Sequence, residues 1–147
     1  PQMRAPRDEL AAVARSALAD RGAPSEVRAG AHVFFAAVAM ASFEDFAPQL
    51  AQVVPPAVEA LRADDGSAAA STSSRQRGVR TGVQEERVAA TEALGAYAAA
   101  VGAQFAAHLP AALPALCAQA QHVSPQVRAA ASAALARVGR LLGAVAG

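Results

Sequence analysis

The chain has 147 residues, a net charge of +1, one cysteine and a hydrophobic content of 54%, of which aromatic residues are only a small part. The lone Cys117 excludes an internal disulfide framework, and the near-neutral charge gives no reason to expect nucleic acid or an anionic membrane as a partner. The longest apolar run, residues 29–41, is too short to cross a membrane, and no secretory signal is visible at the start. Most of the hydrophobic residues are alanine, which favours helices over strands.

Three helices are predicted before residue 63, because apolar residues recur there at helical spacing. The first covers residues 6–20 and is stopped by a glycine and a proline. The second covers residues 25–41. The third covers residues 46–62, and we expect Pro55 and Pro56 to kink it, because proline removes a helical donor and clashes with the preceding turn.

The composition changes at residues 63–80, which are small and polar and have no apolar period. This segment is predicted to be a flexible inserted loop. Three further helices are expected at residues 83–101, 104–121 and 124–142. The last of them opens on a serine followed by proline at the first helical position, a common helix start.

The two halves of the sequence can be aligned with each other. When Phe46 is placed on Phe105, Arg28 falls on Arg87. The step from Arg87 to the next equivalent arginine, Arg128, is shorter, and the difference equals the length of the segment 63–80. The unit without this insertion is therefore about 41 residues of two antiparallel helices, a period typical of HEAT and armadillo repeats.

The predicted fold is an all-α HEAT-repeat solenoid, a superhelix of antiparallel helix pairs. Residues 1–62 would hold a partial repeat and a full one, residues 63–80 the inserted loop, and residues 81–147 a full repeat and a partial last one. Residues in matched register are expected in the core between helices: Phe35, Phe46, Leu94, Phe105, Leu109 and Leu135. The equivalent arginines could contact adjacent repeats through carbonyls or acidic groups, or could be solvated: Arg28, Arg87 and Arg128.

The pattern also predicts a piece of a longer solenoid, because it opens on a second-type helix and closes on a first-type helix. Six apolar side chains near the two ends are then expected to lack cover and to favour association: Leu10, Val13, Leu18, Leu135, Val138 and Leu142.

No catalytic, cofactor-binding or metal-binding residues are predicted, and the chain is not expected to be an enzyme. The histidines His32, His108 and His122 fall in different helices or turns, with no Cys or carboxylate at metal-ligand spacing. The adjacent acids Glu85 and Glu86 are placed in a first helical turn, where they would favour the helix dipole.

The stretch 79–95, VRTGVQEERVAATEALG, resembles the middle of importin-β superfamily receptors, and the importin-four and importin-five branch in particular. The segments FAAHLP (105–110) and PQVR (125–128) resemble the following helices of that family. Upstream, EVR (26–28) through FAPQL (46–50) is similar to the repeat before the family's acidic loop. Here that loop has only two acidic residues and three arginines, which puts loop-mediated capture of basic cargo in doubt.

The resemblance implies a nuclear import receptor segment that acts in both cytoplasm and nucleus. Its implied partners are protein cargo, FG-repeat nucleoporins and Ran GTPase, with the Ran site outside this segment. The alternative is a HEAT-repeat scaffold of another complex, such as a phosphatase subunit. A HEAT-repeat enzyme would need a metal constellation that the sequence does not contain.

Overall fold

The computed structural model describes residues 6–63 and 74–146, and over these residues the chain is helical and has no strand, which confirms the all-helical class. Two of the helices are of the 3-10 type and precede α-helices directly. In chain order the elements are α1 (Pro6–Ala19), α2 (Ser25–Ser42), η1 (Phe43–Gln49), α3 (Leu50–Arg62), α4 (Ser74–Val101), η2 (Gly102–His108), α5 (Leu109–Gln119) and α6 (Pro125–Ala146).

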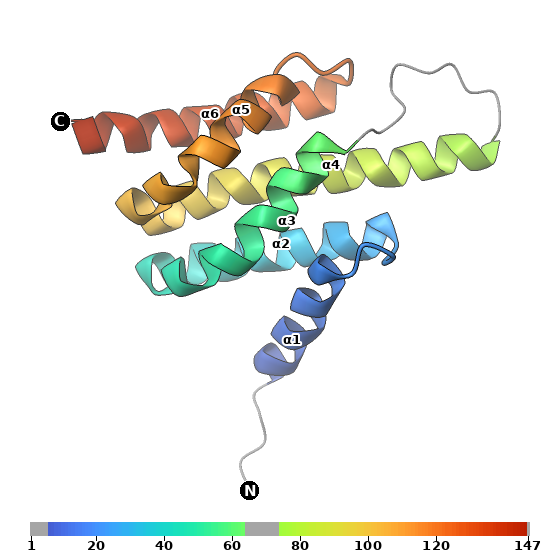
Figure 1. The fold of residues 1–147 in the computed structure, drawn as a ribbon, viewed down its shortest axis with the longest axis horizontal. Coiled ribbons are helices and arrows are strands. Elements are labelled where there is room, and N and C mark those ends of the chain that lie inside the picture. The colour runs from blue at the N-terminus through green and yellow to red at the C-terminus, as the bar shows by residue number, and fades with distance from the viewer. Residues whose placement is uncertain (1–5, 64–73, 147) are drawn as a thin grey trace, which may run out of the picture.

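The helices form two layers. Helices α2, α4 and α6 run side by side in the same direction, with α4 in the middle, and α4 has its most extensive contacts with these two neighbours (Figure 1). Helices α1, α3 and α5 lie across them in the second layer and pack on α2, α4 and α6, respectively. Each helix of the second layer thus covers apolar residues of one helix in the first layer.

The repeat of the sequence recurs in the helix boundaries. The register that places Phe46 on Phe105 also places the end of α2 on the end of α4, η1 on η2, and the start of α3 on the start of α5. The first residue after α2 and the first residue after α4 have a positive φ, 54° at Phe43 and 65° at Gly102. A residue with positive φ at this position ends the helix before the chain continues into the 3-10 helix of the second layer.

The core lies between the two layers and contains the residues that the matched register selects. Phe35, Phe46, Leu94 and Phe105 are fully buried. Leu109 and Leu135 are only partly buried, but both pack against the core cluster. The Phe46 ring stacks on that of Tyr97 in α4, with ring centroids 5.2 Å apart, which joins η1 to the middle helix.

Two glycines allow α4 to approach both of its neighbours closely. A Cβ atom at Gly95 would lie 3.0 Å from the Cα of Ala134 in α6, so no larger residue fits there without a backbone shift. A Cβ atom at Gly82 would lie 2.8 Å from a carboxylate oxygen of Glu26, at the start of α2. The Glu26 side chain opposite Gly82 can move aside, so it is the backbone contact at Gly95 that would force α4 and α6 from the observed spacing if a side chain were added.

The predicted loop 63–80 is wrong over its last seven residues, because α4 begins at Ser74 and not near residue 83. Arginine and glutamine are good helix formers, so a segment without an apolar period can still be helical. Residues 64–73, which carry the rest of that prediction, lie outside the described residues.

The helices predicted from residues 46 and 104 also differ in their first turns. Each opens as a 3-10 helix, η1 or η2, before the α-helix starts at Leu50 or Leu109. The α-helical assignment of α3 continues through Pro55 and Pro56. The tight 3-10 turn serves as the connector that lets the chain change layers.

The expectation of uncovered apolar residues near both ends is partly wrong. Leu18 and Val138 are buried in the core cluster. Their helices, α1 and α6, pack against α2 and α4, which the prediction of uncovered ends did not take into account. Leu10, Val13 and Leu142 are exposed, Val13 to 65%.

One stretch, Gly82–Gln119, is long and apolar enough to cross a membrane by length and composition alone. It spans most of α4 and all of η2 and α5, and the positive φ of Gly102 lies within it. The core helix of a soluble protein passes the same test, and this part of α4 packs between α2 and α6. The absence of a membrane partner stays an expectation from the sequence.

Candidate functional site

The three equivalent arginines all bind backbone carbonyls at the junction before their own helix. Arg28 donates to the carbonyls of Arg21 and Ala23, between α1 and α2. Arg128 donates to the carbonyls of His122 and Val123, at 2.8 and 2.9 Å, between α5 and α6. These carbonyls lie in the turns after α1 and α5, and Nη1 of each guanidinium group donates to two of them.

Arg87 makes the same kind of contact and is almost completely buried. It donates to the carbonyls of Leu61, at 2.5 Å, and Ala63, at the end of α3. It also donates to the side-chain oxygen of Gln119 in α5, at 2.7 Å, and the Gln119 amide donates in turn to the Leu61 carbonyl. This network ties α3, α4 and α5 together at one point.

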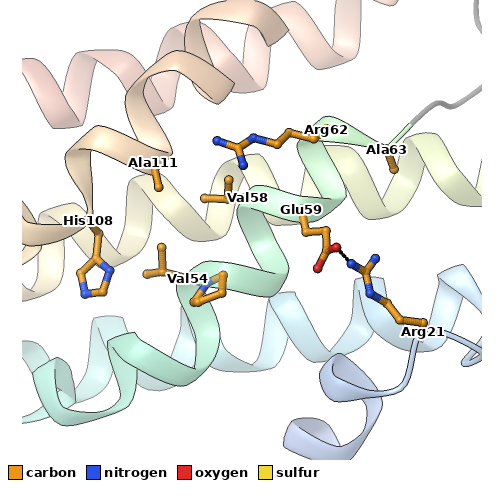
Figure 2. Close-up of a pocket in the computed structure, with 9 residues that line it drawn as sticks. Arg21, Val54, Val58, Glu59, Arg62, Ala63, His108 and Ala111 are labelled. Atoms are coloured by element: carbon orange, nitrogen blue, oxygen red, sulfur yellow. Dashed lines mark ion pairs between the residues drawn. The ribbon is translucent and has the colours of Figure 1, made fainter.

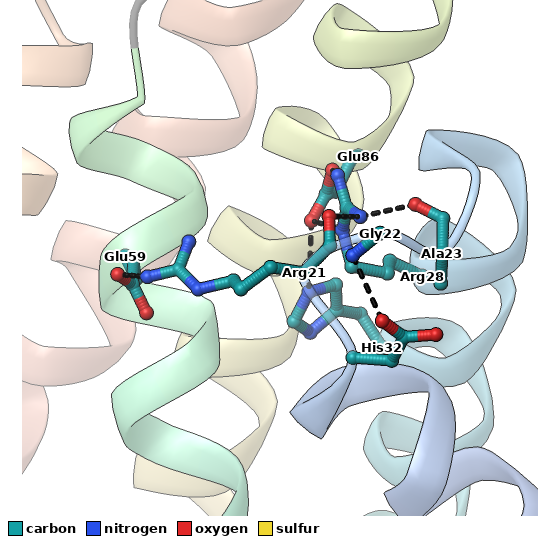
Figure 3. Close-up of polar contacts among 8 residues, drawn as sticks. Arg21, Gly22, Ala23, Arg28, His32, Glu59 and Glu86 are labelled. Atoms are coloured by element: carbon teal, nitrogen blue, oxygen red, sulfur yellow. Dashed lines mark hydrogen bonds and ion pairs between the residues drawn. The ribbon is translucent and has the colours of Figure 1, made fainter.

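A second polar cluster joins α2 to α4. The Arg28 guanidinium forms a bidentate pair with the Glu86 carboxylate, at 2.9 and 3.0 Å, and the His32 ring lies 3.8 Å from the same carboxylate (Figure 3). Burial by itself raises the pKa of Glu86. The neighbouring His32 ring and the Arg28 charge outweigh that effect and hold the pKa below its ordinary value.

The three arginines that were predicted to be equivalent thus contact different parts of the structure. Arg28 contacts helices on both sides of its own, through the junction after α1 and through Glu86 of α4. Arg87 contacts α3 and α5. The bonds of Arg128 run to the short turn before its own helix, and its side chain is exposed there.

Glu86 and Gln119 were missed as contact residues by the sequence analysis. Glu86 was placed in a first helical turn, but α4 begins twelve residues earlier, and the carboxylate is buried against α2. Its neighbour Glu85 is exposed. No local signal distinguishes the two acids, because the partner of Glu86 lies 58 residues away along the chain.

A cleft of about 500 Å³ opens between α3, α5 and the turn that follows α1 (Figure 2). Its floor is apolar and includes Val54, Val58 and Ala111. Its rim carries Arg62, His108 and an ion pair between Arg21 and Glu59. The cleft therefore combines an apolar floor with charged and imidazole side chains at its rim.

A larger groove, about 900 Å³, runs over the opposite layer. Residues from α2, α4 and α6 line it, and most of them are alanine, glycine or valine. Its two charged lining residues are Glu85 and Glu92. Grooves of this kind, apolar with a few polar groups, are typical of surfaces that bind a partner segment.

Metal chemistry finds no support in the described part of the chain, where no three His, Cys, Asp or Glu side chains gather into a possible metal site. His32 lies beside Glu86, His108 on the rim of the cleft, and His122 in the turn before α6, where its ring accepts a bond from the Ser124 amide. The three histidines therefore lie in separate environments.

The described part of the chain is all-helical and carries a cleft on one layer and a groove on the other. No protein-family model matches the chain, and no curated protein matches it.

Proposed function

We propose that this chain is a protein-binding segment of an importin-β-type nuclear transport receptor, built from HEAT-type repeats. In this role it contacts other proteins and catalyses no reaction. Its partners are protein cargo and FG-repeat nucleoporins, and Ran GTPase binds elsewhere in the receptor. The protein works in both cytoplasm and nucleus.

The observation that carries the proposal is the agreement between the sequence repeat and the helix boundaries. The register that places Phe46 on Phe105 superposes helix ends, 3-10 connectors and the positive φ at Phe43 and Gly102. A repeated pair of helices that buries its apolar faces against neighbouring pairs leaves broad outer surfaces available. Such architectures act mainly as binding scaffolds.

The family assignment is supported by the residues that resemble importin-β receptors. The resembling stretch 79–95 contains Arg87 and Glu86, which hold α4 against α3 and α2. The resembling segment 105–110 begins with the buried Phe105. The resembling segment 125–128 ends with Arg128. Arg87 and Glu86 thus bond α4 to its neighbours and Phe105 lies in the core, whereas the bonds of Arg128 stay within the turn before α6.

Binding to Phe-Gly repeats tests the proposal directly. A fluorescent peptide with several Phe-Gly pairs should bind the purified chain with saturable anisotropy, and a peptide with serine in place of each phenylalanine should not. An equal response to both peptides, or to neither, would contradict the nuclear transport role.

The alternative, a HEAT-repeat scaffold of another complex such as a phosphatase, predicts a different result. Such a scaffold shares the fold but has no reason to prefer Phe-Gly over Ser-Gly. Because the resemblance in the stretch 79–95 favours the transport family, we keep the scaffold as the second hypothesis.

A further inference from the structure

The groove over α2, α4 and α6 has a floor made of very small side chains. Ala89 and Ala130 are buried at its base, and Gly30 lies open to it, because a Cβ atom there would meet nothing within 4 Å. Val33 on α2 is 57% exposed at the same surface. A floor of this kind lets the side chains of a second helix reach the surface of all three helices.

The charge of the groove comes from one helix and has one sign. Glu85 and Glu92 both line it from α4, and they are seven residues apart, so they lie on one face about 10.5 Å apart along the helix axis. No arginine or histidine lines the groove. Among the described residues, neither carboxylate has an ion-pair partner.

From this geometry we infer that the groove binds a basic amphipathic helix of a partner protein. The apolar side of that helix packs on the alanine floor and Val33. Two of its lysine or arginine side chains, two turns apart, pair with Glu85 and Glu92. The inference rests on the protein-binding part of the proposed function and adds to it the surface used and the chemistry of the partner.

A synthetic helical peptide provides the probe. It carries a leucine and alanine face and lysines seven residues apart, and its matched control has glutamate at the lysine positions. The lysine peptide should bind the full chain, more weakly at higher salt, and the glutamate peptide should not bind. Equal binding of the two peptides, or no binding of the lysine peptide, overturns the inference.

Variants of the chain locate the binding. The double variant Glu85→Gln, Glu92→Gln should weaken the lysine peptide about tenfold. The control Glu44→Gln, Asp45→Asn removes two exposed acids of η1 and should leave the affinity unchanged. Gly30→Leu fills the groove from a helical position with open space, and should weaken binding at least about tenfold without loss of helix.

Crosslinking provides an independent readout, because the chain contains 13 arginines and no lysine. A carbodiimide that joins carboxylates to amines should therefore link the lysine peptide to Glu85 or Glu92, with the chain's own terminal amine as the only competitor. Links confined to other acids overturn the inference.

The Phe-Gly peptide, run in parallel, separates the two proposals. Phe-Gly binding without lysine-peptide binding overturns the groove inference alone. Lysine-peptide binding without Phe-Gly binding supports the groove and contradicts the transport role.

Discussion

Phe43 and Gly102 occupy equivalent positions of the two repeats, and both have a positive φ, 54° and 65°. Glycine adopts this conformation without cost, whereas a side chain with a Cβ atom is strained there. Both repeats thus have a positive φ at this position, although the Phe43 side chain makes that conformation unfavourable in the first repeat.

Replacing Phe43 with glycine should therefore stabilise the protein by about 1 kcal/mol. The Phe43 side chain is 60% exposed, so little buried apolar area is lost. Chemical denaturation would measure the gain. The reverse change, Gly102→Ala, should cost about 1 kcal/mol at the equivalent position. A loss of stability in Phe43→Gly would show that its ring contributes more than its backbone conformation costs.

Gly95→Ala should destabilise the protein by about 1–3 kcal/mol, because the new Cβ atom would lie 3.0 Å from the backbone of α6. Gly139→Ala is the matched control. It adds the same atom to a helix where nothing lies within 4 Å, and should raise stability by about 0.5–1 kcal/mol through helix propensity. Thermal melts of the two variants should shift in opposite directions, and shifts of the same sign would contradict the close approach of α4 and α6.

The buried pair of Arg28 and Glu86 should make stability depend on pH. The pKa of Glu86 is held below its ordinary value of 4.5, so the folded state binds this proton more weakly than the unfolded chain does. The stabilisation is fully present above the unfolded pKa and is lost as the pH falls through the folded pKa. Denaturation midpoints measured from pH 7 down to pH 3 should show this decline.

Glu86→Gln should reduce that pH dependence and cost about 2 kcal/mol near neutral pH, because it leaves the Arg28 guanidinium without its charged partner. Glu59→Gln, which breaks the exposed pair with Arg21, is the control and should cost less than about 1 kcal/mol. Equal effects of the two changes would argue against a special role for the α2–α4 pair.

Phe105→Ala should cost about 3–5 kcal/mol, because the ring is fully buried and its removal leaves a cavity. A thermal melt provides the measurement. Ala106→Gly at the exposed neighbouring position is a suitable control, with an expected loss of no more than about 1 kcal/mol. An unchanged melt of Phe105→Ala would contradict the shared register of Phe46 and Phe105.

The sequence by itself determined the helical class, most helix boundaries and the repeat, because these depend on local propensity and on the spacing of apolar residues. It also selected Phe46 and Phe105, since a large side chain at the same place in two units has to be buried in both. It failed at the start of α4, because residues 74–80 have no apolar period in the sequence and yet are helical.

Only the tertiary structure decided which polar residues join the helices. Glu85 and Glu86 are chemically alike and adjacent, yet one lines an open groove and the other is buried against Arg28. Similarly, Gln119 becomes a buried partner of Arg87 because α3 and α5 meet α4 at that point. The burial of apolar residues can be predicted from their helical spacing within one helix. A polar contact depends on a partner that the fold brings from a distant part of the chain.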